Sequence, residues 1–147
     1  MPLVRWDRIA DHAPVHAYGG SGETVLLVED DVDLRSVMRR MLRYDGYRVL
    51  EARDGLVALE KLEAEPAIAL VLTDVAMPRL DGLGLCERVA RLRPGLPVLL
   101  LSASFPDALP AGGVLDLPLD FLEKPFLPTT LRAKVRRLLG VAREARA

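Results

Sequence analysis

Asp74 is the residue whose surroundings in the sequence most clearly suggest chemistry. It follows the apolar stretch 70–73 and precedes Met77-Pro78 and Asp81-Gly82, two pairs that favour a turn over a continuing strand. Because ligands bind at the carboxyl ends of strands in open parallel sheets, a carboxylate at this position is a candidate for a reaction. The alternative is an aspartate that merely caps the following turn.

Polar side chains also follow three other predicted strands, at the edge of the sheet where Asp74 would lie. They are Glu29 and Asp30 after residues 25–28, Ser102 after residues 98–101, and Lys124 after residues 120–123. Three carboxylates at one edge repel one another and raise each other's pKa unless a cation lies among them. Oxygen ligands favour a hard divalent ion, so we expect Mg2+, with Mn2+ as a substitute. A lysine and a hydroxyl beside that ion could bind a phosphoryl group, which favours an aspartyl phosphate.

Helices are expected between these strands because apolar residues recur with helical spacing. The spacing predicts helices around residues 34–42, 58–62, 83–92 and 131–139, the last ending at Gly140, and one more strand at 47–51. Five strands alternating with helices predict an α/β fold, a parallel sheet doubly wound with helices on both faces. Segment 105–118 is rich in Pro and Gly, so a fourth helix there would be short or irregular.

The composition is that of one domain with tails. The chain has 147 residues, half of them apolar, which is too few for two ordinary domains. We expect an N-terminal tail and glycine-rich linker at residues 1–23, a domain at 24–140, and a C-terminal tail at 141–147. His12 and His16 have the spacing of metal ligands on a helix, but the proline between them favours solvated tail residues.

Charge and cysteine content narrow the classes of function. The formal net charge is -1 and 28% of residues are charged, so the balance indicates no bias toward nucleic acid or anionic membranes. The single cysteine, Cys86, excludes an internal disulfide framework and fits a reducing compartment. We find no apolar stretch of membrane-spanning length and no secretory signal, so we expect a cytoplasmic protein.

Four motifs together resemble the receiver domain of bacterial two-component response regulators, a chemotaxis-regulator-like family. They are VLLVEDD at 25–31, LTDVAMPRLDG at 72–82, LSA at 101–103 and FLEKPF at 121–126. Each is weak alone, but four strand-end motifs in order over residues 24–140 are specific. The resemblance implies a flavodoxin-like fold with strand order 2-1-3-4-5.

The resemblance also implies the chemistry of the acidic residues. Asp74 matches the phosphoacceptor, which attacks the phosphohistidine of a histidine kinase or phosphotransfer protein. The metal ligands would be Glu29, Asp30, Asp74 and the backbone carbonyl of Ala76. Ala76 and Ser104 also match two positions that tune dephosphorylation, and because alanine cannot hold a water by a side-chain hydrogen bond, we expect slow dephosphorylation.

Three further residues match the phosphoryl-binding and switching parts of the family. Lys124 and Ser102 would bind the phosphoryl group, and the Lys124-Pro125 peptide bond is expected to be cis. Ser102 and Phe121 would form a conformational switch, in which the ring turns inward when the hydroxyl moves. Phosphorylation would thereby shift an existing equilibrium and control a downstream protein target whose identity is unknown.

Several residues have a plainer explanation than chemistry. Asp31 is favoured as a helix cap over a metal ligand, and Asp81 with Gly82 as a turn. Phe121 could be ordinary core packing. The basic residues of the last helix are favoured as a solvated face, so we expect no direct nucleic-acid binding. They are Arg132, Lys134, Arg136 and Arg137.

Other classes of protein remain as alternatives to a phosphorylated receiver, which would modify itself without being a conventional enzyme. A pseudo-receiver that only binds partners would normally lack some of the acids or the lysine, and this chain keeps them. A Mg2+-dependent phosphatase of the haloacid dehalogenase type typically has a second aspartate where this chain has Ala76.

The glycine-rich linker also resembles the junction before the receiver of a hybrid histidine kinase. Segment 105–118 puts family-style dimerisation in doubt.

Overall fold

The computed structural model describes residues 21–103 and 118–146. The strands are β1 (Thr24–Val28), β2 (Arg48–Ala52), β3 (Ile68–Asp74), β4 (Val98–Ser102) and β5 (Leu119–Glu123). The helices within these residues are α2 (Val32–Tyr44), α3 (Gly55–Ala64), α4 (Gly82–Leu92) and α5 (Pro128–Arg146). The predicted fourth helix at 105–118 falls outside the described part of the chain, apart from its last residue.

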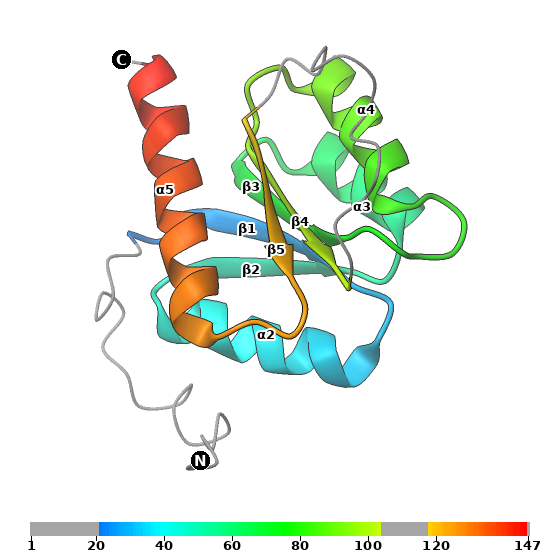
Figure 1. Cartoon of the computed structure of the whole chain (residues 1–147). Helices are drawn as coiled ribbons and strands as arrows, with labels where there is room; N and C mark the ends of the chain where they lie inside the picture. Colours follow the sequence, from blue (N-terminus) through cyan, green and yellow to red (C-terminus); the bar gives the residue numbers. More distant parts are fainter. Residues whose placement is uncertain (1–20, 104–117, 147) are drawn as a thin grey trace.

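The five strands form one parallel sheet in the order β2-β1-β3-β4-β5 (Figure 1). β1 and β3 pair near the centre of this sheet, and all of their side chains except that of Ala69 are buried. The apolar stretches in the sequence therefore correspond to the buried strands. The predicted fold class and strand order are confirmed.

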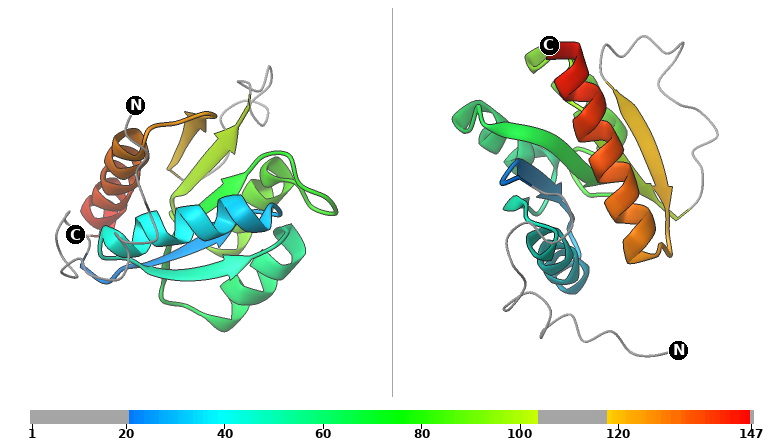
Figure 2. Two further views of the ribbon diagram at one scale, coloured as in Figure 1. Left: turned by 90° about the horizontal axis from the view of Figure 1, so that it is seen from below. Right: turned by 90° about the vertical axis from the view of Figure 1, so that its left-hand side faces the viewer.

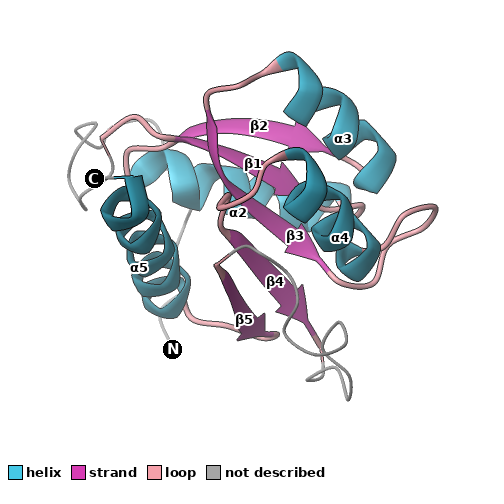
Figure 3. Ribbon diagram, turned by 90° about the horizontal axis from the view of Figure 1, so that it is seen from above, coloured by secondary structure: helices cyan, strands magenta, loops and turns pink. Residues whose placement is uncertain are grey.

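Helices cover both faces of the sheet (Figures 1 and 3). One core cluster joins α2 and α5 to one face, through residues such as Met38 and Val135. The other joins α3 and α4 to the opposite face, through residues such as Leu62 and Cys86. Alternate residues of the strands supply the two clusters, because successive side chains of a strand point to opposite faces. The exception is in β3, where Ala69 and Leu70 both join the cluster of α2 and α5 at an irregularity in the pairing with β1. Cys86 is fully buried in α4.

Three helices begin with an aspartate cap at the edge of the sheet where the strands end, here called the carboxyl edge. Asp31 accepts from the backbone N–H groups of Asp33 and Leu34 at the start of α2. Asp54 and Asp81 cap α3 and α4 in the same way. The capping role predicted for Asp31 is confirmed. These caps fix short loops that carry the chain from each strand into the next helix.

The last helix does not end at Gly140 as predicted but continues to Arg146. A glycine inside a helix costs about 1 kcal/mol relative to alanine. The extra turns bury Ala142 and bring Arg143 Nη2 to 2.7 Å from Glu23 Oε2. Tertiary contacts therefore outweigh the local preference, and Figure 2 shows α5 as one continuous helix on the same side of the sheet as α2.

Two apolar residues within the predicted helices 34–42 and 83–92 share the helical spacing of core residues but are exposed. Val37 in α2 and Leu92 at the end of α4 have exposed fractions of 36% and 48%. Helical spacing defines a face but not where the covering element ends, so residues at its margin can be misassigned. No helix in residues 21–103 or 118–146 is long and apolar enough to cross a membrane.

Candidate functional site

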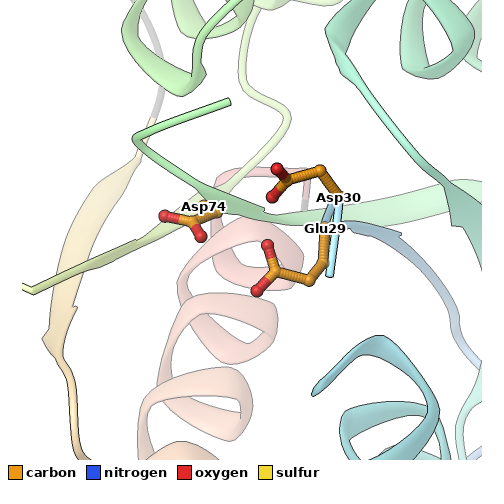
Figure 4. Close-up of side chains that lie close together, drawn as sticks. All are labelled: Glu29, Asp30 and Asp74. Atoms are coloured by element: carbon orange, nitrogen blue, oxygen red, sulfur yellow. The ribbon is translucent and has the colours of Figure 1, made fainter. Parts of the chain in front are cut away.

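Three carboxylates meet at the carboxyl edge, where β1 and β3 end side by side (Figure 4). Glu29 and Asp30 follow β1, and Asp74 is the last residue of β3. One oxygen from each of the three lies within 4.8 Å of the other two. We call Glu29, Asp30 and Asp74 the acidic cluster. The sequence predicted this convergence from strand ends alone.

The three acids differ in their exposure. Glu29 is 1% exposed and Asp74 is 8% exposed, whereas Asp30 lies at the surface. Burying a carboxylate is unfavourable unless a cation or hydrogen-bond donors compensate for the lost water. The cluster thus has a buried side, formed by Glu29 and Asp74, and a solvent-exposed side, formed by Asp30.

Lys124 supplies the cation that the described part of the chain brings to this cluster. Its Nζ is 2.7 Å from Asp74 Oδ2 and 3.4 Å from Glu29 Oε1. The lysine follows β5, which lies two strands away from β3 in the sheet. One ammonium contacts two of the three carboxylates, so the carboxylates of the cluster outnumber its cation.

Burial and the neighbouring charges shift two pKa values in the cluster. Burial, followed by the hydrogen bond and charge of Asp74, raises the pKa of Glu29 to about 7, although Lys124 opposes the rise. For Lys124, burial lowers the pKa, but the hydrogen bond to Asp74 and the charge of Glu29 outweigh it and raise the pKa above its ordinary value. A carboxyl group with this environment gains from an additional cation nearby.

The donor set fits a divalent metal ion. Glu29 Oε2 is buried and finds no hydrogen-bond partner among the described residues. An unpaired buried carboxylate oxygen is costly, and a metal ion would satisfy it. The other oxygens come from Asp30 and Asp74, an all-oxygen set that suits Mg2+ better than a soft metal.

The backbone around Asp74 is held closely. Ala76 donates its backbone N–H to Asp74 Oδ1 at 3.2 Å, and Val75 donates its N–H to the carbonyl of Leu101 at 2.9 Å. Gly82 lies so near that a Cβ there would collide with the Asp74 carbonyl oxygen. The Gly82 N–H in turn donates to the Val75 carbonyl at 2.9 Å. The turn predicted at 81–82 therefore also supports the Asp74 backbone.

The predicted phosphoryl-binding and switch residues lie at the end of β4, on β5 and directly after β5. Ser102 ends β4, and its carbonyl accepts from the Lys124 backbone N–H at 2.7 Å. The Lys124-Pro125 peptide bond, predicted to be cis, is cis in the structure. Phe121 is half-buried on β5 and packs against the core cluster shared with α3 and α4. Ser104 lies outside the described residues.

Two contacts to the acidic cluster were not found from the sequence. Arg35 in α2 donates from Nη1 to the backbone carbonyl of Glu29 at 2.8 Å. Gly82 makes the close approach described above. Neither residue type nor spacing signals these roles, since Arg35 resembles any charged residue on a helix surface.

The sequence of the chain matches the family model described as the response regulator receiver domain over residues 25–136. This match covers most of the chain. The chain belongs to the response regulator receiver domain family. The predicted resemblance is thereby confirmed, and the domain is a receiver with the flavodoxin-like fold of that family.

Known proteins similar to this chain include a response regulator, a chemotaxis protein and the receiver domain of a hybrid histidine kinase. Response regulator MprA of Mycobacterium ulcerans (strain Agy99) is 41% identical over 115 residues, which cover 78% of this chain and 49% of MprA. The chain thus spans about half the length of the curated relatives it matches. In the structure of Vibrio cholerae chemotaxis protein CheY4, the matched region covers 80% of this chain and 99% of CheY4, with a TM-score of 0.73 and 27% identity. The receiver domain from the hybrid histidine kinase CckA matches at 33% identity and a TM-score of 0.65, covering 79% of this chain and 98% of that one.

Proposed function

We propose that this receiver accepts a phosphoryl group on Asp74 from a histidine kinase or phosphotransfer protein, with Mg2+ bound at the acidic cluster. The observation that carries the proposal is the excess of carboxylates over cations there, three carboxylates with one lysine. The cluster would accept a divalent cation and then a phosphoryl group that the same cation and Lys124 can bind. The family match supports the proposal.

In the proposed reaction one carboxylate oxygen of Asp74 attacks the phosphorus of phosphohistidine. A P–O bond forms while the P–N bond of the donor breaks, and its electron pair returns to the imidazole. Lys124, whose Nζ contacts Asp74 Oδ2 at 2.7 Å, would then pair with the phosphoryl oxygens. The Ala76 N–H, now on Asp74 Oδ1, helps to hold the carboxylate. Mg2+, held by Glu29, Asp30, Asp74 and the Ala76 carbonyl, would supply positive charge to the phosphoryl oxygens.

Phosphorylation would then act as a conformational switch. The new oxygens would compete with Glu29 for Lys124 and draw the Ser102 hydroxyl toward Asp74, which selects one arrangement of the loops. The backbone hydrogen bond between Lys124 and Ser102 links these two movements. Phe121 on the neighbouring strand would turn inward in response. The output is recognition by a downstream protein, so the domain is not a conventional enzyme.

The phosphoryl group is expected to persist. Ala76, which is exposed beside Asp74, has no side-chain group that could hold an attacking water. We propose that dephosphorylation is unassisted and slow. A phosphoryl lifetime of only seconds would contradict this part of the proposal.

The test is incubation with Mg2+ and a small acyl phosphate, followed by intact mass measurement and a phosphate-affinity gel. Wild-type protein should gain one phosphoryl group, and Asp74→Asn should gain none. Asp81→Asn is the matched control, because it removes a nearby carboxylate from the same loop while asparagine still caps a helix well. A wild type that stays unmodified with Mg2+ present would favour a pseudo-receiver, and a phosphorylated Asp74→Asn would place the acceptor elsewhere.

A further inference from the structure

Arg35 connects the start of α2 to the backbone of the acidic cluster. Its Nη1 donates to the Glu29 carbonyl at 2.8 Å, and its Nε is 3.3 Å from Glu51 Oε1 on β2. The Arg35 side chain is 19% exposed, so the guanidinium lies mostly within the protein. We propose that Arg35 is a positioning residue that holds the Glu29–Asp30 loop in the geometry that binds the metal ion, an inference that rests on the proposed function.

Both polar groups of the Glu29 backbone are held. The Glu29 N–H donates to the Ala52 carbonyl at 3.0 Å, and the carbonyl accepts from Arg35. The pairing of β1 with β2 and β3 ends at Val28, so the Glu29 carbonyl lies where the strand has stopped. The hydrogen bond from Arg35 therefore restrains the plane of the Glu29–Asp30 peptide, and this plane restricts the backbone from which the two side chains extend.

Glu51 and Arg39 hold Arg35 in turn. Arg39 Nη1 lies 3.1 Å and 3.2 Å from the two carboxylate oxygens of Glu51. The carboxylate of Glu51 therefore bridges two guanidinium groups. A guanidinium fixed on one side by a carboxylate can point its remaining N–H groups in a defined direction. This arrangement ties the metal-binding loop to the outer strand β2.

Arg35 has a structural explanation as well, since partly exposed ion pairs make a small contribution to stability. Two features distinguish positioning from stability or charge. A positioning residue changes metal affinity at unchanged thermal stability. The charge of Arg35 alone repels a metal cation, so removing it would tighten binding if charge were its only influence. Loss of positioning weakens binding, which is the opposite sign.

The experiment measures the Kd for Mg2+ by calorimetry and the Tm of the full chain for Arg35→Met, Arg35→Lys and Arg43→Met. Arg35→Met keeps the apolar stem but removes all donors, and we expect the Kd to rise about 10-fold, the lower end of the range for partners of metal ligands. Arg43→Met removes the same charge from an exposed position near the end of α2, and its Kd should stay within about twofold of wild type.

Arg35→Lys provides the second variant and separates charge from geometry. Lysine keeps the charge but cannot contact Glu29 and Glu51 with one rigid fork, so its Kd should lie between those of wild type and Arg35→Met. An Arg35→Met Kd equal to or below that of wild type, at a Tm within a few degrees, overturns the role of Arg35. If Arg35→Met proves unfolded, a wild-type Kd in a folded Arg35→Lys overturns it as well. Failure of wild-type protein to be phosphorylated on Asp74 is a separate result, which contradicts the proposed function.

Discussion

Glu29 and Asp74 are buried carboxylates at the carboxyl edge, and Asp45 is a buried carboxylate between the end of α2 and the start of β2. Asp45 Oδ1 is 3.1 Å from Arg132 Nε, an arginine of α5, and Arg136 adds positive charge nearby. Glu29 and Asp74 share Lys124 and lie beside a third carboxylate, Asp30. At the Asp45 site the cations are at least as many as the anions, whereas the acidic cluster has fewer cations than anions.

Perturbed pKa values alone do not distinguish these two sites. Burial raises the pKa of Asp45, with Arg132 opposing the rise, and burial likewise leads the rise in the pKa of Glu29. The balance of charge does distinguish them. Asp45 has its partner within the protein and links α2 to α5, whereas the three carboxylates of the acidic cluster share one lysine. A deficit of positive charge therefore indicates a cation-binding site better than a shifted pKa does.

The sharpest test of this comparison is Lys124→Met. Loss of one preorganised donor to a developing charge typically costs about 100-fold or more in rate, so phosphorylation of Asp74 by an acyl phosphate should slow by at least that factor. Mg2+ should bind more tightly, because the ammonium no longer repels it. Rates of phosphorylation by mass spectrometry and a Mg2+ titration measure both effects. A rate within tenfold of wild type would contradict the proposed role of Lys124.

A second test targets the backbone of Asp74 instead of its charge. Gly82→Ala places a Cβ against the Asp74 carbonyl oxygen and near Val75 Cα, so the loop must shift. Overpacking of this kind costs about 1–3 kcal/mol, and the shift should also slow phosphorylation. Denaturant unfolding and the phosphorylation rate report the two effects. Gly140→Ala is the control, because a Cβ at Gly140 meets no atom within 4 Å.

Arg132→Met tests the site at which Asp45 pairs with Arg132. The carboxylate of Asp45, which is 4% exposed, would lose its hydrogen-bonded partner. Leaving a buried acceptor unsatisfied costs about 1–3 kcal/mol of unfolding free energy. Phosphorylation of Asp74 should be unchanged, because Arg132 pairs with Asp45, which lies between the end of α2 and the start of β2. A large loss of phosphorylation at unchanged stability would reverse the comparison between the two sites.

The smallest expected effect is the dependence of stability on pH. Since folding raises the pKa of Glu29 from 4.5 to about 7, its contribution is fully present below pH 4.5 and is lost as the pH rises through about 7. The Tm of metal-free protein should therefore fall between pH 5.5 and 8, by about 4 °C for each 1 kcal/mol lost. Mg2+ should stabilise more at pH 8, where Glu29 is deprotonated. Glu29→Gln should flatten the profile, whereas Glu63→Gln on the exposed side of α3 should not.

The local pattern of the sequence predicted the elements and the acidic cluster well. Apolar stretches ending in Glu29, Asp74 and Ser102 indicated strands, and residues such as Asp31 indicated where helices begin. These predictions succeed because strand ends, caps and turns depend on neighbouring residues. The end of α5 was missed because distant contacts of Ala142 and Arg143 outweigh the cost of Gly140.

By itself the sequence determined which residues end each strand, and hence that Asp74 meets Glu29, Asp30 and Lys124. Only the tertiary structure decided how these groups are balanced and held. The Asp45–Arg132 pair joins residues 87 positions apart, and Lys124 reaches Glu29 across 95. The Arg35 contact to Glu29 spans six residues, yet it depends on Glu51 of β2. Such contacts depend on distances and directions between packed elements, which residue types and spacing do not specify.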